Sequence, residues 1–157
     1  MFGKLFKLNF KLKLWTWWTI PLLAMTGAKV IYLDDKSIKV KIKLKWLTKN
    51  HLGSMYLGAQ AIGADLTGGG LLLNAIERTG KKVSVAFKDM QCEFLKRPEG
   101  DVIFSCNDGE LIDKMMLETY ETGERVNKPV KVEARVPSIS DELVSRFTLT
   151  LSVKYKS

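Results

Sequence analysis

Strict alternation of apolar and polar residues is the clearest pattern in this chain. Between positions 38 and 46, apolar residues at every second position alternate with four lysines. A period of two places successive side chains on opposite faces of a β-strand, so one face of this strand belongs to the core and the other carries a row of lysines. Alternation and short apolar runs predict five further strands, at positions 30–33, 83–94 (with an irregularity near Asp89), 102–106, 130–136 and 147–155.

Apolar residues at three- and four-residue steps predict three helices. The first covers residues 1–21 and ends near Pro21, and a shorter one around residues 111–120 stops at Gly123. The longest begins at Ser54, whose hydroxyl can cap free amides, and continues through small residues. Glycines inside it, such as Gly58 and Gly63, each cost a helix about 1 kcal/mol relative to alanine, which indicates that other backbone approaches closely.

The order of these elements predicts an α+β fold. Hairpin-linked strands imply an antiparallel sheet, so we expect six antiparallel strands wrapped around the central helix, with an additional N-terminal helix. At 157 residues the chain is expected to form a single domain, residues 1–157. The N-terminal amphipathic helix at 1–21 and a core at 28–157 make up this domain.

The N-terminal helix allows three interpretations. Its lysines and tryptophans suit the surface of an anionic membrane, but the same pattern describes a helix packed on its own domain. A signal peptide is the third interpretation, because lysines precede an apolar stretch; the tryptophans and Pro21 within that stretch argue against it. No apolar run reaches the roughly 18 residues that a membrane-spanning helix needs.

Positive charge is concentrated in the first third of the chain. Eleven lysines and two acids occur up to Asn50, and the net charge of the whole chain is +8. The lysine row at 38–46 is either a solvated face or protected sheet edge, or a surface for phosphates or acidic lipid.

Cys92 and Cys106 have no metal-binding or redox spacing and predict reduced thiols in a cytoplasmic protein. Because His51 is the only histidine, zinc and iron sites built on imidazole are effectively excluded. We expect no metal site and no cofactor.

One carboxylate, Asp65, lies in the small-residue helix. It shares a helical face with Gly58, Ala61 and Ile62, which lie seven, four and three residues before it. An acid on such a face is costly unless it is used or paired. One interpretation is an aspartate that hydrogen-bonds a neighbouring turn; the other is a catalytic group.

A motif before this helix favours the catalytic interpretation. The pattern Asn50-x-x-Gly53-x-x-Tyr56-x-Gly58, with Asp65 nine positions after Tyr56, resembles the hotdog-fold acyl-CoA thioesterases of the phenylacetate-pathway type. Their pattern is Asn-x-x-Gly-x-x-His-Gly-Gly, with an acid nine positions after the histidine. The resemblance runs from about Ala28 to Tyr155 and is closest to an uncharacterised, thioesterase-like branch of that superfamily.

The resemblance implies a hotdog fold and a thioester site. It makes Asp65 the catalytic carboxylate and Ser84 a strand serine that helps to position water. The resemblance also implies which residues contact the thioester. They lie at or just before the helix start: Asn50, Gly53, Tyr56, Leu57 and Gly58. Two departures from the family pattern concern the chemistry: Tyr56 stands where the family has histidine, and Leu57 stands where it has the first glycine of the pair.

Helix geometry indicates that one chain cannot complete this site. Nine residues at about 1.5 Å each place Asp65 roughly 13 Å from its own helix start, too far to share one carbonyl group. Two antiparallel copies of the helix across a twofold axis can bring the two together, and the resembled thioesterases share their site between subunits in this way. We therefore expect a homodimer or a dimer of dimers.

Three functions compete. The first is hydrolysis of an acyl-CoA or related acyl thioester. The second is a non-catalytic hotdog module that binds an acyl or lipid ligand, associated with a membrane surface through peripheral contact of the first helix. The third, nucleic-acid binding, ranks last because the strand lysines alternate without interleaved exposed aromatic residues. Phosphate-loop enzymes are disfavoured because the glycine cluster at 68–70 lacks the following lysine.

Overall fold

A computed structural model of the chain describes residues 2–156 and contains one six-stranded sheet. All neighbouring strands pair antiparallel, in the order β1-β2-β4-β5-β6-β3. The strands are β1 (Lys29–Leu33), β2 (Ile38–Ile42), β3 (Val83–Phe94), β4 (Val102–Cys106), β5 (Arg125–Val136) and β6 (Ser140–Tyr155). The predicted sheet is confirmed, including the irregularity near Asp89, where the register of β3 against β6 shifts. The order leaves β1 and β3 at the two edges.

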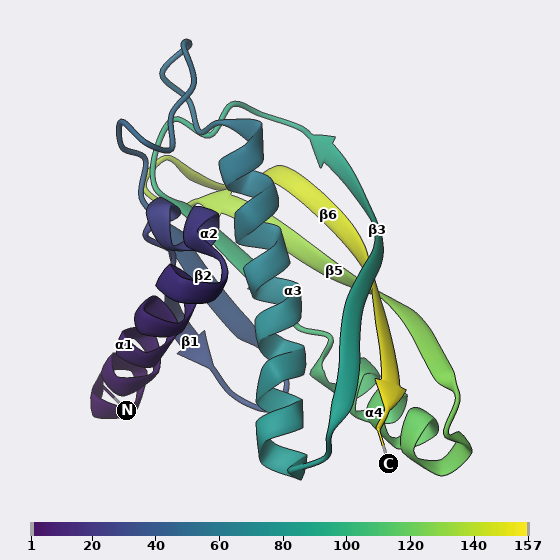
Figure 1. Cartoon of the computed structure of the whole chain (residues 1–157). Helices are drawn as coiled ribbons and strands as arrows, with labels where there is room; N and C mark the ends of the chain where they lie inside the picture. The colour runs from purple at the N-terminus through teal and green to yellow at the C-terminus, as the bar shows by residue number, and fades with distance from the viewer. Residues whose placement is uncertain (1, 157) are drawn as a thin grey trace.

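Four helices accompany the sheet in the described part of the chain. They are α1 (Phe2–Thr19), α2 (Pro21–Thr26), α3 (Leu57–Thr79) and α4 (Gly109–Thr122). Figure 1 shows the strands curving behind α3, with α1 and α2 on the β1 side of the molecule. The arrangement is the hotdog architecture with an additional N-terminal helix, as predicted. No helix within residues 2–156 combines the length and hydropathy needed to cross a membrane.

The core lies between α3 and the inner face of the sheet. The sheet contributes the large buried side chains Phe104 and Phe147, and α3 contributes small residues and leucines. Gly63 is required because a Cβ there would lie 2.4 Å from the Phe104 ring. The glycine therefore admits an aromatic side chain, whereas the sequence had predicted an approaching backbone.

Several predicted element ends are wrong. β5 and β6 begin at Arg125 and Ser140, five and seven residues before their predicted starts, and two further ends differ. The strand at 38–46 ends at Ile42, and Trp46, predicted to be a core residue, is 80% exposed. The long helix begins at Leu57 with Tyr56 as its N-cap, and Ser54 does not cap it. Ser54 is buried in the preceding loop and hydrogen-bonds Asn50. Tertiary contacts decide these last two ends.

One side of α1 packs on the domain. Leu5, Leu8 and Leu12 contact the core. The Asn9 side chain donates from Nδ2 to the Val30 carbonyl at 2.8 Å, and its Oδ1 accepts from the Val30 backbone amide, also at 2.8 Å. This side chain satisfies the outward backbone groups of the edge strand β1. The predicted stop near Pro21 is confirmed, since Pro21 begins α2 instead of continuing α1.

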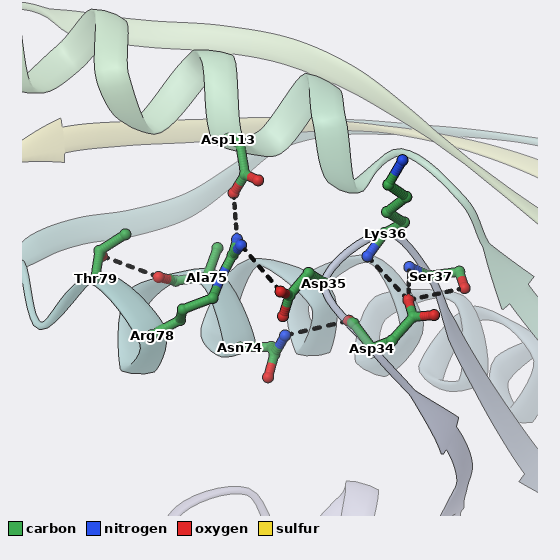
Figure 2. Close-up of polar contacts among 9 residues, drawn as sticks. All are labelled: Asp34, Asp35, Lys36, Ser37, Asn74, Ala75, Arg78, Thr79 and Asp113. Carbon is green, nitrogen blue, oxygen red and sulfur yellow. Dashed lines mark hydrogen bonds and ion pairs between the residues drawn. The ribbon is translucent and has the colours of Figure 1, made fainter.

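Polar contacts hold the C-terminal end of α3 in place. The Asn74 amide donates to the carbonyl of Asp34 in the β1–β2 turn at 3.2 Å. The Arg78 guanidinium lies between two carboxylates, 3.4 Å from Asp35 and in contact with Asp113 of α4 (Figure 2). The turn, α3 and α4 are thus held together around one arginine.

Candidate functional site

The loop before α3 is shaped by Asn50. Its side-chain oxygen accepts hydrogen bonds from the amides of Leu52 and Ser54, at 2.9 and 3.2 Å, and its amide donates to the Ser54 hydroxyl at 3.1 Å. Gly53 completes the turn with a φ of +81°, a conformation that side chains other than glycine rarely adopt. Asn50 and Gly53 therefore build the loop that leads to the helix.

Backbone contacts hold the end of this loop outside the helix. The amide of Met55 donates to Pro98 and that of Tyr56 donates to Thr48, at 2.9 and 2.8 Å. The first helical hydrogen bond runs from Gln60 to Tyr56. Within residues 2–156, the amides of Leu57, Gly58 and Ala59 find no acceptor. Such free amides, together with the helix dipole, favour a negative charge at this helix start.

The Tyr56 ring lies over the first turn of α3. A Cβ added to Gly58 would lie 2.5 Å from Cε1 of this ring, so glycine allows the ring to rest against the helix backbone. The ring remains half exposed. Tyr56 thus packs against Gly58 in the first turn of α3 and is still partly open to solvent.

A hollow of about 450 Å³ opens beside the helix start. It is lined by the loop between Asn50 and Leu57, by Gln60, and by residues 94–98 at the end of β3. Its lining includes two cationic side chains, Lys96, which pairs with Glu142, and Arg97, which is exposed and forms no ion pair within the described residues. The hollow therefore combines free amides with positive charge.

Asp65 is half-buried and stands alone. Within the described residues its carboxylate has no hydrogen-bond or ion-pair partner, so the predicted bond to a neighbouring turn is not formed. Burial raises the pKa of this carboxyl above its ordinary value, since water is excluded and no cation compensates. A charge held at such a cost and without a partner is characteristic of functional sites.

A strip of small and apolar residues surrounds Asp65 and is left partly uncovered. This α3 stripe consists of residues spaced three and four apart on the outer side of the helix: Gly58, Ala61, Ile62, Asp65, Gly69 and Leu73. Gly69 packs against Phe87 of β3, so the stripe adjoins the open edge of the sheet. Along that edge Phe87, Met90 and Phe94 are partly exposed.

Ser84 lies on the other face of β3. It pairs with the exposed Lys154 of β6, whereas its neighbour Val85 pairs with the buried Val153. Directly opposed residues share a face of the sheet and successive residues alternate. Ser84 is therefore on the face away from α3 and does not meet Asp65 within one protomer. Its role in positioning water stays a prediction.

A buried polar pair was not predicted from the sequence. The Ser145 hydroxyl of β6 donates to Oε1 of the Gln60 side chain at 2.9 Å. Nε2 of the same side chain donates to the Met55 carbonyl at 3.2 Å. These bonds connect the helix start to the sheet and fix the floor of the hollow. A glutamine among the alanines of the helix was the available signal, but its partner is 85 residues away.

Other chemistry finds little support in the described residues. No group of three or more histidine, cysteine or acidic side chains there could hold a metal ion. Cys92 and Cys106 are unpaired thiols. Burial raises the pKa of Cys106 to about 12, so a nucleophilic thiolate is not available at neutral pH.

Similar structures share this architecture. A Pseudomonas aeruginosa protein of unknown function, described as a probable thioesterase, is 22% identical with a TM-score of 0.77, over 90% of this chain and 91% of that one. A Chlorobaculum tepidum protein of unknown function is 11% identical with a TM-score of 0.82, over 97% of each chain. A Staphylococcus aureus thioesterase, studied as glutamine-to-alanine and glutamate-to-alanine variants, is 13% identical with a TM-score of 0.64; the glutamine variant aligns over 85% of this chain and 98% of its own.

At these identities the likeness establishes the hotdog fold. No curated protein matches the sequence. A family model does match, described as a domain of unknown function (DUF4442), and it spans residues 12–153. This chain is therefore a member of the DUF4442 family.

Proposed function

We propose that the protein hydrolyses an acyl-CoA thioester at a site shared between two copies of the chain, as the phenylacetate-pathway thioesterases do. The observation that carries the proposal is Asp65, an unpaired, half-buried carboxylate on the uncovered α3 stripe. In the reaction, water adds to the thioester carbonyl, the carbon–sulfur bond breaks, and a carboxylic acid and a free thiol leave.

Asp65 and the helix start supply complementary chemistry. The carboxylate can act as a general base toward water or as a nucleophile. Its raised pKa makes it a stronger base than an ordinary aspartate. The free amides of Leu57, Gly58 and Ala59 can donate to the oxygen that becomes negative, assisted by the helix dipole.

A second copy of the chain supports this arrangement. The twelve-residue edge strand β3 carries exposed apolar side chains, and an edge of this kind favours pairing with another strand. The small residues of the stripe permit close approach of a second α3 beside that edge. Antiparallel α3 helices can then bring Asp65 of one copy toward the helix start of the other.

Two further observations support a coenzyme A substrate and the roles of Asn50 and Asp65. Arg97 and Lys96 line the hollow at the helix start, where they can meet phosphate groups. In the Staphylococcus aureus thioesterase, the glutamine and the glutamate changed to alanine are fifteen residues apart. Asn50 and Asp65 have the same spacing and pair an amide with a carboxylate in the same order.

The direct test measures thiol release from short, long and aromatic acyl-CoAs. We expect the native protein to hydrolyse at least one class and Asp65→Asn to lose about a hundredfold or more in rate, the usual contribution of general acid–base catalysis. Glu77→Gln is the matched control, because Glu77 is an exposed acid on the same helix. Unchanged turnover in Asp65→Asn would refute the assignment. Acyl-CoA binding without hydrolysis by the native protein would favour the binding-module alternative.

Sharing of the site has its own test. Leu57 is the first helical residue, where proline is tolerated, and Tyr56 before it has the extended conformation that precedes proline (φ −61°, ψ 140°). Leu57→Pro therefore removes one amide while the helix is kept. Co-expressed Leu57→Pro and Asp65→Asn chains should regain activity that neither homodimer has, because one site of each heterodimer is intact. No recovery would contradict a shared site.

A further inference from the structure

Helix α1 has two apolar sides, and only one of them packs on the rest of the domain. The side with Leu5, Leu8 and Leu12 packs on the core. The outer side carries an apolar ridge whose members recur at three- and four-residue steps and are each more than half exposed: Phe6, Phe10, Leu14 and Trp17. Trp18, beside this ridge, is 83% exposed. A ridge of this composition is costly in water and indicates a binding surface.

Positive charge flanks the apolar ridge on both sides. With 100° between successive residues of a helix, Lys13 projects on one side of the ridge, and Lys7 and Lys11 project on the other. All three lysines are exposed. The chain contains no acidic residue before Asp34. The surface complementary to this helix is therefore apolar within and negatively charged at its border.

The ridge is separate from the proposed dimer contact. Asn9 ties α1 to β1, at the opposite edge of the sheet from β3. Figure 1 shows α1 and α2 on the side of the molecule away from β3. A second copy bound along β3 therefore leaves the ridge uncovered.

We propose that the outer side of α1 docks the protein on the surface of a bilayer that contains anionic lipid. Phe6, Phe10 and Trp17 enter the boundary between headgroups and acyl chains, where aromatic side chains are favoured. Lys7, Lys11 and Lys13 extend their apolar stems along the helix and place their ammonium groups at the lipid phosphates. Because α1 is already fixed on the domain, the surface is formed before binding and little ordering is required.

Vesicle flotation with the full-length protein tests the proposal. The native protein should float with phosphatidylcholine vesicles that contain phosphatidylglycerol and should bind pure phosphatidylcholine much more weakly. Phe10→Gln combined with Trp17→Gln should abolish flotation. Gln at Lys7, Lys11 and Lys13 together should weaken partitioning by roughly a hundredfold, at about fivefold per lysine. High salt should reproduce much of the lysine effect.

Matched controls use exposed residues elsewhere. Leu117→Gln with Ile139→Gln removes exposed apolar side chains from α4 and the β5–β6 turn, and Gln at Lys114, Lys131 and Lys154 removes three exposed lysines. Both controls should bind as the native protein does. Failure of the native protein to float, or native-like flotation of the Phe10/Trp17 variant, would overturn the proposal. So would a native oligomer, seen by sedimentation without vesicles, that the Phe10/Trp17 variant disrupts, because the ridge would then bind a second copy.

Fluorescence locates the contact. Trp46 is the only tryptophan outside α1, so Trp46→Phe leaves Trp15, Trp17 and Trp18 as reporters. Anionic vesicles should shift their emission to the blue, and brominated lipids should quench it. Flotation without any quenching would place the bound surface elsewhere and refute the role of α1.

Discussion

Gly63→Ala tests how the central helix is fitted into the sheet. An ideal Cβ at this position would lie 2.4, 2.5 and 2.8 Å from three atoms of the Phe104 ring. Non-bonded carbons prefer about 3.5 to 4.0 Å, so the ring would have to retreat by about 1 Å. Phe104 is fully buried and its ring centroid lies 6.4 Å from that of Phe147, which is also buried. Because both rings are buried, Phe104 can retreat only if neighbouring core side chains also shift.

The expected loss follows from two opposing effects. Overpacking a core costs about 1 to 3 kcal/mol, and a clash with three atoms of a fixed ring belongs in the upper half of that range. Alanine returns about 1 kcal/mol of helix propensity. We expect a net loss of about 1 to 2 kcal/mol in the free energy of unfolding. With a urea m-value of about 2 kcal/mol/M, the midpoint should fall by roughly 0.5 to 1 M.

Urea unfolding at one fixed protein concentration measures the effect, because association would otherwise change the midpoint. Phe104→Leu provides the internal control, since it removes the ring atoms that clash. In the Phe104→Leu background, Gly63→Ala should be neutral or stabilising, and the two changes should therefore be strongly non-additive. A Gly63→Ala protein as stable as the native one, or an equal loss in both backgrounds, would refute the reasoning.

The remaining predictions concern Asp65 and Gly109. Burial raises the folded-state pKa of Asp65, so the native protein loses stability as the pH rises through that pKa. Asp65→Asn should therefore be more stable than the native protein at neutral pH and should lose this advantage at acidic pH. Urea midpoints measured across pH would show the difference. Gly109→Ala should cost at least about 2 kcal/mol in urea unfolding, because its Cβ would lie 2.2 Å from the Asp35 carbonyl oxygen and 2.5 Å from Lys36 Cα. Native-like stability of Gly109→Ala, or a pH-independent effect of Asp65→Asn, would contradict these predictions.

Alternation predicted β2 well but not its end. Ile38, Val40 and Ile42 are all buried, as a period of two requires. Beyond Ile42 the partner strand β4 has no further residue to pair with, since Ile42 pairs with Val102 at the beginning of β4. Asp101 there accepts a hydrogen bond from the Leu44 amide at 3.0 Å, in place of a ladder bond. Where a partner strand ends is a tertiary fact that alternation cannot encode.

The start of the central helix was misplaced for a similar reason. Capping rules consider a serine with its own following amides, and Ser54 satisfies them. In the structure Asn50 engages the Ser54 hydroxyl and amide. Pro98 and Thr48 hold the next two amides in an extended loop. Contacts from distant parts of the chain thus outweigh the local cap.

The candidate site could be predicted only in part. Periodicity places Asp65 on one side of the helix with Gly58 and Ile62, and the structure leaves that side open. The sequence could not show that Asp65 lacks a partner or that the Tyr56 ring rests on Gly58. For Ser84 the signal was present, because alternation with Val83 and Val85 places this serine on the polar face of β3. Its assignment to the site came instead from the resemblance to the thioesterases.

The two edges of the sheet are treated differently, and the difference bears on both proposals. At β1 the Asn9 side chain satisfies the backbone of Val30, and α1 covers the strand. At β3 twelve residues remain at an edge with exposed apolar side chains. Natural sheets protect such edges unless another chain pairs with them. The open edge lies beside the stripe that carries Asp65, so the contact that would cover this edge is also the one that would complete a shared site. At the protected edge, the outer side of α1 stays exposed and can bind a different surface.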